Sequence, residues 1–154
     1  MTEEVFNLRT CAECTGRGDL EGWVFRYLSS GYWANPGLRD GLLLHRRFWL
    51  GPSSVPIERL ERCCGPEDGM AYHVPADIWQ RRVDQLAEAL ENLESLPPLI
   101  VEWCEGRLMI RDGNHRCAAI IRKGWTSCFI VLWCNSSVDQ RQAAASLNID
   151  ITRR

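Results

Sequence analysis

The segment Asp112-Gly113-Asn114-His115-Arg116 brings together residue types that occur in anion-binding and catalytic sites. Residues 107–110 before it predict a strand, and residues 114–123 after it predict a helix. A glycine lets the backbone turn and approach a ligand closely. The free N–H groups and the dipole at the start of a helix favour an anion, especially phosphate. We therefore predict a phosphate-binding site at Gly113, Asn114, His115 and Arg116.

The charged side chains of this segment suit such a site. Arg116 offers a planar guanidinium group for phosphate oxygens, and His115 can donate a hydrogen bond or titrate near neutral pH. Asp112 is placed to hold Mg²⁺ or to accept a proton from a hydroxyl group. The same residues also fit an ordinary strand–turn–helix junction in which Asp112 only caps the helix. The residues alone leave both interpretations open.

Other polar side chains are candidates for the same pocket. The loop that follows the first predicted strand supplies Glu67 and Asp68, and His73 belongs to the same loop. Arg46 and Arg47 form a short basic cluster, which is typical of a solvated surface but is also a candidate for completing a nucleotide pocket.

The hydrophobic pattern from residue 53 onward predicts alternating strands and helices, which is typical of a small α/β domain. Gly124 is expected to end the motif helix, and Gln140 closes a capping box with Ser137. The expected elements are a strand at 55–60, a helix from its cap Asp77 to Asn92, a hairpin of 99–103 and 107–110, a helix at 114–123, a strand at 127–133 and a helix at 138–147.

Residues 1–52 are rich in glycine and aromatic residues and show no clear periodicity. We expect an irregular N-terminal extension there, with a short helix or strand at 23–28, a strand at 42–50, and Trp33 as a candidate for lining a substrate pocket. The predicted organisation is a single domain, 1–154, with the extension at 1–52, an α/β core at 53–135 and a C-terminal helix at 136–154.

Composition and charge limit the classes of function. The chain has 154 residues, 45% hydrophobic and 25% charged, which is typical of a globular protein. Its net charge of −2 argues against nucleic-acid binding through bulk positive charge. No apolar run approaches the roughly 20 residues of a membrane span. The acidic N-terminus lacks the apolar segment of a secretory signal, so we expect a cytoplasmic protein.

The eight cysteines permit a disulfide framework or a metal site in principle. Cys11 and Cys14 resemble one half-site of a DnaJ-type zinc finger, but zinc requires four ligands and no second Cys-x-x-Cys pair follows. Cys63 and Cys64 are adjacent, which is a poor spacing for joint chelation. We therefore expect no structural zinc and no structural disulfide, and ordinary cysteines in a glycine-rich turn at 11–18.

The motif at 112–116, followed by Ala119 and Gly124, resembles the signature of the ParB/sulfiredoxin-like superfamily. The resemblance covers roughly Ser53 to Trp133, about half of the chain. The segment Gly65–Met70 also looks like the small stand-alone bacterial ParB-like proteins. The resemblance implies a small α/β domain with a mixed sheet flanked by helices. Because this superfamily hosts several activities, the motif indicates the fold and leaves the activity open.

The departures from the family pattern narrow the implied activity. Asn114 stands where sulfiredoxins have their catalytic cysteine, and an asparagine cannot form a thiosulfinate. Chromosome-partitioning ParB proteins carry Gly-Glu-Arg-Arg where this chain has Gly113 to Arg116, and they carry a helix-turn-helix domain for which about twenty residues after Trp133 leave no room. The free-serine kinases, with Asp-Gly-His-His-Arg, are closest in motif.

Similarity to the kinase branch implies a nucleotide-binding protein with ATP- or ADP-dependent phosphotransferase or nucleotidase activity on a small hydroxylated acceptor or on water. It places the phosphates at Gly113–Arg116, Mg²⁺ on Asp112, and the general base at Glu67. The alternative is a DNA-associated ParB-like nuclease or a partition or regulatory module, which the charge disfavours. A third alternative is an interaction module that keeps the fold without turnover.

Overall fold

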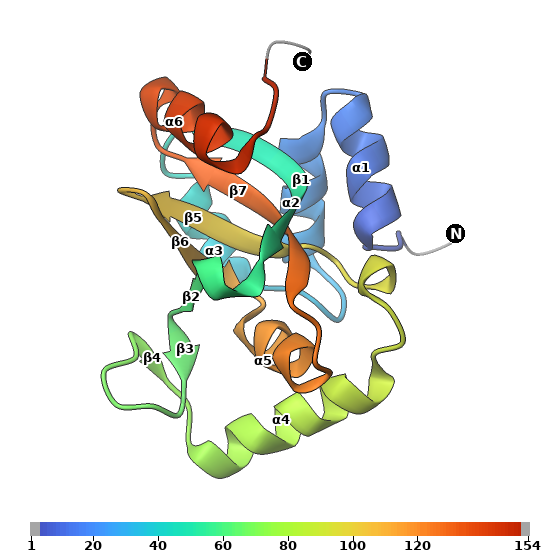
Figure 1. The fold of residues 1–154 in the computed structure, drawn as a ribbon. Helices are drawn as coiled ribbons and strands as arrows, with labels where there is room; N and C mark the ends of the chain where they lie inside the picture. The colour runs from blue at the N-terminus through green and yellow to red at the C-terminus, as the bar shows by residue number, and fades with distance from the viewer. Residues whose placement is uncertain (1–3, 152–154) are drawn as a thin grey trace.

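The computed structural model describes residues 4–151, which form one mixed sheet with helices on both faces (Figure 1). Five strands lie in the order β1-β7-β5-β6-β2, and β3 and β4 form a separate two-stranded ribbon. The strands are β1 (Phe48–Pro56), β2 (Leu60–Arg62), β3 (Cys64–Gly65), β4 (Tyr72–His73), β5 (Leu99–Cys104), β6 (Arg107–Asp112) and β7 (Ser127–Cys134).

The helices are α1 (Leu8–Gly16), α2 (Leu20–Ser29), α3 (Pro36–Leu42), α4 (Ala76–Ala89), α5 (Asn114–Arg122) and α6 (Ser137–Leu147), with short 3₁₀ turns at Ile57–Arg59 and Leu93–Ser95. The predicted α/β class is confirmed, as are the hairpin of β5 and β6, the motif helix α5 and strand β7. Among residues 4–151, none of the helices has the length and apolar character needed to span a bilayer.

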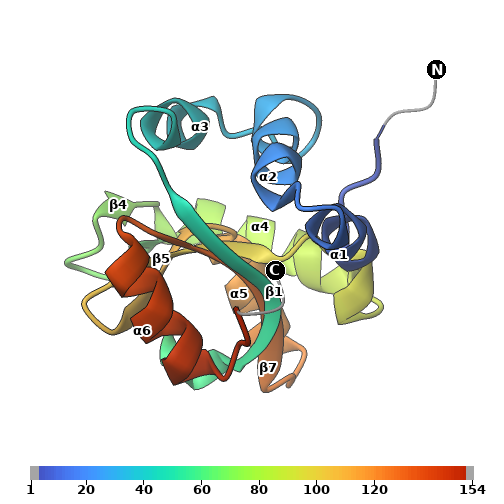
Figure 2. The same ribbon diagram turned by 90° about the horizontal axis from the view of Figure 1, so that it is seen from above.

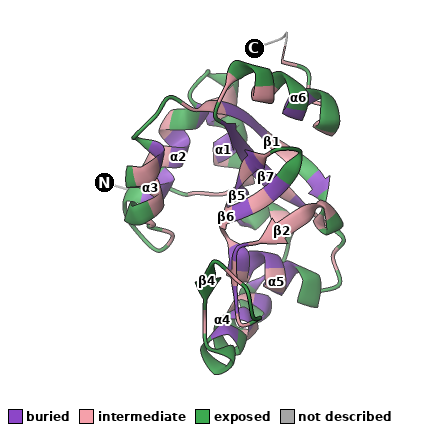
Figure 3. Ribbon diagram, turned by 90° about the vertical axis from the view of Figure 1, so that its left-hand side faces the viewer, coloured by how far each residue is buried: buried purple, intermediate pink, exposed green. Residues whose placement is uncertain are grey.

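The two central strands are buried on both faces (Figure 3), which explains their nearly continuous apolar sequence. Strand β5 pairs in parallel with β7 and antiparallel with β6. Successive side chains point to opposite faces. Ile100 and Val131 therefore pack against the N-terminal helices, while Val101 and Leu132 pack against the core formed with α4, α5 and α6.

The expectation of an irregular N-terminal extension is wrong, because residues 8–42 form three helices that cover one face of the sheet (Figure 2). Trp23, Tyr27 and Leu28 are fully buried between these helices and the sheet. Glycines at helix ends and a dense aromatic cluster conceal the helical period. Strand β1 begins at Phe48, inside the segment assigned to the extension, and residues 42–47 precede it as the end of α3 and a loop. The domain boundaries themselves stay predictions.

The single strand expected at 55–60 is divided in the structure. Strand β1 ends at Pro56, a 3₁₀ turn follows, and Leu60 begins β2. The two strands lie at opposite edges of the sheet (Figure 1), so one straight strand cannot form both. The alternating sequence pattern does not reveal this crossing.

Two expected helix caps are also corrected. Helix α4 begins at Ala76 after Pro75 and ends at Ala89, so Asp77 lies in the first turn, where its charge complements the helix dipole, instead of at the cap. In α6 the capping side chain belongs to Ser136, whose hydroxyl accepts a hydrogen bond from the Asp139 amide at 3.1 Å. Two adjacent serines make this start ambiguous by one residue.

Because helices cover both faces of the sheet, we expect truncation of a buried side chain to destabilise the protein equally on either face. Ile100→Ala and Leu132→Ala each remove a fully buried side chain, from the face under the N-terminal helices and from the opposite face. We expect each to lower the free energy of unfolding by about 2–5 kcal/mol in urea titrations. A cost below about 1 kcal/mol for Ile100→Ala alone would mean that the N-terminal helices are only loosely attached.

Candidate functional site

The junction between β6 and α5 requires a glycine for two reasons. Gly113 has φ +103°, a left-handed conformation that other residues rarely adopt. A Cβ atom at this position would also lie 2.6 Å from Leu99 Cδ2 and 2.7 Å from Arg116 Nη2. The chain can therefore pass directly from the strand into the helix only because position 113 has no side chain.

The carboxylate of Asp112, at the end of β6, receives hydrogen bonds from three side chains. The Tyr27 hydroxyl donates at 2.7 Å, the Asn35 amide at 3.0 Å and the Arg116 guanidinium at 3.0 Å. Burial raises the pKa of Tyr27, so its hydroxyl stays protonated and able to donate. Two of the three donors come from the N-terminal helical segment. This segment therefore fixes the orientation of Asp112.

Arg116 is almost completely buried, with 2% of its side chain exposed. Its guanidinium carbon lies 5.6 Å from the centre of the Tyr27 ring and 4.8 Å from that of Trp33, which are distances for cation–π contact. Within residues 4–151, its Nε and Nη1 atoms have no hydrogen-bond partner. Arg116 thus contacts Asp112 and the aromatic rings, and its role as a phosphate ligand stays a prediction.

The Asn114 side chain connects the motif helix to the end of β2. Its Oδ1 atom accepts a hydrogen bond from the Cys63 amide at 3.0 Å, and its side chain is buried. The Cys63 thiol in turn donates to the Ile110 carbonyl at 2.9 Å. The side chain of Asn114 therefore serves the fold, and its backbone amide is the group left for a ligand.

His115 lies half-buried against the ring of Trp79, with 4.4 Å between the ring centres. Burial lowers its pKa below the ordinary value of 6.5, and the nearby positive charges of Arg82 and Arg62 lower it further. The imidazole is therefore neutral at neutral pH. Its Nε2 atom is buried and has no hydrogen-bond partner among the described residues.

The start of α5 presents unpaired backbone donors. The first intrahelical bond runs from the Cys117 amide to the Gly113 carbonyl, and no side chain in the described part of the chain caps the amides of Asn114, His115 and Arg116. Such amides, together with the helix dipole, form an anion site. Asp112, the alternative cap, is instead held by its three donors.

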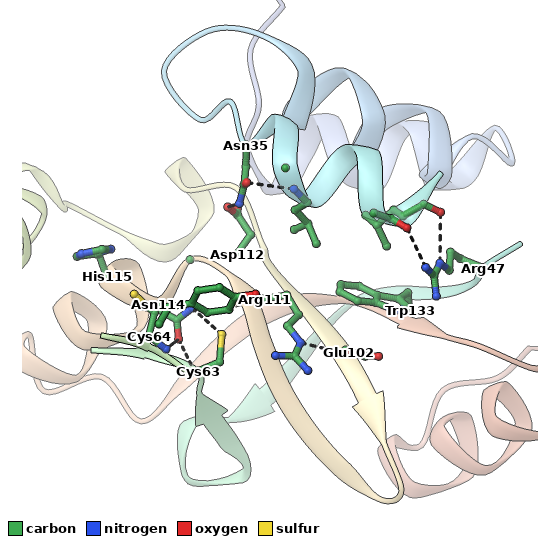
Figure 4. Close-up of a pocket in the computed structure, with 16 residues that line it drawn as sticks. Asn35, Arg47, Cys63, Cys64, Glu102, Arg111, Asp112, Asn114, His115 and Trp133 are labelled. Carbon is green, nitrogen blue, oxygen red and sulfur yellow. Dashed lines mark hydrogen bonds and ion pairs between the residues drawn. The ribbon is translucent and has the colours of Figure 1, made fainter. Parts of the chain in front are cut away.

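Two cavities meet at this junction, and both are lined by Asn35, Asp112, Gly113 and His115. The larger one, of about 710 Å³, extends from the start of α5 past Arg111 and Glu102 to Trp133 on β7 and Arg47, which precedes β1 (Figure 4). The smaller one, of about 440 Å³, lies between α4 and the segment that follows α2. Asp112 and His115 therefore separate two spaces that one elongated ligand can occupy.

The larger cavity carries two arginines. Arg111 donates through Nε to Glu102 at 2.9 Å, and Figure 4 shows its guanidinium within the cavity. Arg47 donates to the carbonyls of Gly41 and Leu42 and bonds to Asn135, so its guanidinium is already engaged by the protein. Arg111 therefore places a positive charge in the larger cavity directly before the motif.

The other residues predicted for the site lie elsewhere. Glu67 forms an ion pair with Arg62, which lowers the pKa of its carboxyl group. His73 contacts the Pro66 carbonyl at 3.2 Å, and Arg46 lies over the ring of Phe48. In the part of the chain that the structure describes, Glu67, Asp68, His73 and Arg46 line neither cavity, so Glu67 is not brought beside Asp112.

Mg²⁺ held by Asp112 does not fit this arrangement. Mg²⁺ requires octahedral oxygen ligands and usually takes carboxylates, water and phosphate. Both oxygens of Asp112 already accept hydrogen bonds, and the positive charge of Arg116 lies 3.0 Å away. No cluster of three or more His, Cys, Asp or Glu side chains within residues 4–151 is arranged to bind a metal ion.

The cysteines are free, and all eight lie within the described residues. Cys11 and Cys14 belong to helix α1 and are buried, in place of the expected glycine-rich turn. Burial raises the pKa of the Cys11 thiol to about 12, which suits a small apolar side chain in the core. The expectation that the protein binds no zinc stays a prediction.

Several site residues escaped the sequence analysis. Tyr27 and Asn35 bond to Asp112 across 85 and 77 residues, and Arg111 and Glu102 face one another across the hairpin. The sequence Asn35-Pro36-Gly37 indicates only a turn, whereas the position of Arg111 directly before the motif is a signal for a site residue. Trp33, expected as a candidate, does line the smaller cavity.

No protein-family model and no curated protein matches the chain. Among solved structures it is similar to sulfiredoxin from Arabidopsis thaliana, with 16% identity, a TM-score of 0.36, and coverage of 64% of this chain and 97% of that one. It is also similar to a Pnob8-like ParB-N domain, with 21% identity, a TM-score of 0.36, and coverage of 66% and 36%.

A third similar structure is the C-terminally truncated chromosome-partitioning protein ParB from Caulobacter crescentus complexed with CTP-gamma-S. It shares 19% identity and a TM-score of 0.37, with coverage of 64% of this chain and 53% of that one. The similar structures are thus a sulfiredoxin and two ParB proteins, the groups that the sequence motif resembles.

The contacts of Gly113 predict the effect of adding a side chain. Gly113→Ala places a Cβ atom in a left-handed conformation and against Leu99 and Arg116, whereas Gly124→Ala, at the other end of α5, meets the same strain (φ +81°) in open space. We expect Gly124→Ala to cost about 1–2 kcal/mol and Gly113→Ala a further 1–3 kcal/mol from overpacking. Equal costs in denaturant titrations would contradict the close packing at the junction.

The lowered pKa of His115 predicts a loss of stability in acid. The unfolded chain takes up a proton as the pH falls through about 6.5, whereas folded His115 does so only at lower pH, so stability decreases across that interval. His115→Phe retains a ring against Trp79 and should remove this part of the pH dependence. Exposed His73→Phe serves as the control and should retain it. Identical pH slopes for wild type and His115→Phe in urea titrations at pH 7 and 5.5 would argue against a buried neutral imidazole.

Proposed function

We propose that this protein binds a nucleotide through its phosphates, at the start of α5 and in the larger cavity. The observation that carries the proposal is the helix start itself. Gly113 brings the backbone close to the cavity, and the amides of Asn114, His115 and Arg116 have no side-chain cap in the described part of the chain. An anion at this position would receive several backbone hydrogen bonds and the favourable end of the helix dipole.

Arg111 supports the proposal as the second group for a charged ligand. It lies on β6, two residues before Gly113, and both residues line the larger cavity. Its Nε atom donates to Glu102 at 2.9 Å, and its side chain also interacts with Cys63. Two anion-binding groups spaced along one cavity of about 710 Å³ suit a di- or triphosphate better than a single phosphate ion.

The geometry supports binding more strongly than turnover. Asp112 is surrounded by donors, and Glu67 is paired with Arg62 outside both cavities. In the catalytic form of the proposal, the nucleotide supplies a phosphoryl group for a small hydroxylated acceptor or for water, and Glu67 accepts the proton. Because Arg62 lowers its pKa, Glu67 is ionised at neutral pH, but the ion pair has to open before the carboxylate reaches an acceptor.

Titration calorimetry with inorganic pyrophosphate, ATP, ADP, CTP and GTP, each with Mg²⁺ and with EDTA, tests the proposed binding. Arg111→Gln should weaken binding of the polyphosphates by about 10- to 150-fold, the value of a hydrogen bond to a charged group. Arg107→Gln is the matched control, because Arg107 belongs to the same strand but pairs with Glu61 at the surface.

Two results would overturn the proposal. One is the absence of binding by every polyphosphate at millimolar concentration. The other is equal affinity of the wild type and Arg111→Gln, which would remove the larger cavity as the phosphate site. Binding of duplex DNA that depends on Arg46 and Arg47, with none to the polyphosphates, would favour the DNA-associated alternative.

Glu67→Gln tests the catalytic form separately. If Glu67 is the general base, phosphate release from a bound nucleotide should fall by about 10²–10⁴-fold, while the nucleotide Kd stays within twofold because Glu67 lies outside both cavities. Release is measured with and without candidate hydroxylated acceptors. Equal rates for the wild type and the variant would remove Glu67 from the mechanism and leave a binding function.

A further inference from the structure

The smaller cavity differs in character from the larger one, and we name it the aromatic cavity. Three of its lining residues are aromatic, and they come from α2 and the segment before α3. The opposite wall is helix α4. The residues that line it and not the larger cavity are Tyr27, Tyr32, Trp33, Ala34, Arg82, Gln85, Leu86 and Arg116.

The most exposed residue that lines the aromatic cavity is Tyr32, whose ring is already held in one orientation. Tyr32 is 82% exposed, which is unusual for an aromatic side chain without a ligand. Its ring is nevertheless oriented, because it packs edge-to-face on Trp33 with 4.7 Å between centres. Trp33 in turn lies over the buried guanidinium of Arg116. Tyr32 therefore presents an ordered surface on which a planar group can stack at little entropic cost.

The wall formed by α4 supplies polar groups instead. Gln85 and Arg82 are exposed on this helix, and neither side chain has a hydrogen-bond or ion-pair partner in the part of the chain that the structure describes. A glutamine amide both donates and accepts, and a guanidinium group donates. This combination suits the polar edge of a heterocycle better than an aliphatic chain, which would leave both groups unpaired.

The aromatic cavity is adjacent to the proposed phosphate site. His115 and Gly113 line both cavities, so the start of α5 lies between them. A volume of about 440 Å³ lies within the range of small-ligand pockets and accommodates a nucleoside. A ligand with its phosphates at the start of α5 can therefore place its remaining part in this cavity.

We propose that the aromatic cavity binds the heterocyclic base of the nucleotide, by stacking on Tyr32 and by hydrogen bonding to Gln85 and Arg82. The inference rests on the proposed function, since it assumes that the phosphates lie at the start of α5. It assigns the N-terminal helical segment a second role, because the segment that fixes Asp112 through Tyr27 and Asn35 also supplies Tyr32 for the base.

Parallel titrations with ATP and inorganic pyrophosphate test this assignment, since pyrophosphate shares the phosphates and lacks the base. Tyr32→Ala should weaken ATP binding by about 5- to 150-fold, the value of one base–aromatic stack, and leave the pyrophosphate affinity unchanged. Tyr32→Phe retains the ring and should bind ATP as the wild type does. Leu44→Ala truncates another highly exposed apolar side chain that lines neither cavity, and it serves as the control.

The outcomes separate the two proposals. If pyrophosphate binds but Tyr32→Ala leaves the ATP affinity unchanged, the base site is overturned and the phosphate site stands. If ATP binds no more tightly than pyrophosphate to the wild type, the base site is likewise overturned. If neither ligand binds, the proposed function itself fails. Circular dichroism of Tyr32→Ala checks that the fold is kept, as expected for a side chain that is 82% exposed.

Discussion

The buried charge pair of Asp112 and Arg116 is the interaction on which the arrangement of the site depends. A charge removed from water is stable only if it is paired and hydrogen-bonded. Arg116 supplies the opposite charge at 3.0 Å, and Tyr27 and Asn35 complete the shell of the carboxylate. Since these two donors belong to the N-terminal helical segment, that segment and the motif must fold together. The position of Asp112 at the start of α5 is thus fixed by Tyr27 and Asn35 from the N-terminal segment and by Arg116 from α5.

This arrangement divides the motif between structure and binding. The side chains of Asp112, Asn114 and Arg116 are directed at the protein, where they connect three separate segments of the chain. The groups without a partner among the described residues include the backbone amides at the helix start and the Nε and Nη1 atoms of Arg116. A site built from amides on a rigid junction is preorganised, which favours binding because little ordering remains when the ligand arrives. The motif therefore matters mainly through the shape that it imposes on the backbone.

The sequence predicts well what local patterns determine. The hairpin, helix α5 and strand β7 follow from hydrophobic periodicity and from Gly113 and Gly124 at the helix ends. The N-terminal helices escape because glycines and aromatic residues conceal their period. The partnership of Tyr27 with Asp112 spans 85 residues, and no local pattern specifies it. Arg116 has the residue type of a phosphate ligand, and no local pattern shows that its side chain is buried beside Trp33.

Amide chemical shifts recorded during a titration with inorganic pyrophosphate test the central claim most directly. If the start of α5 is the anion site, the backbone amides of Asn114, His115 and Arg116 should show the largest saturable shifts, with smaller changes around Arg111 in the larger cavity. Saturable shifts confined to the exposed arginines Arg46 and Arg81, with none at Asn114 to Arg116, would contradict the account.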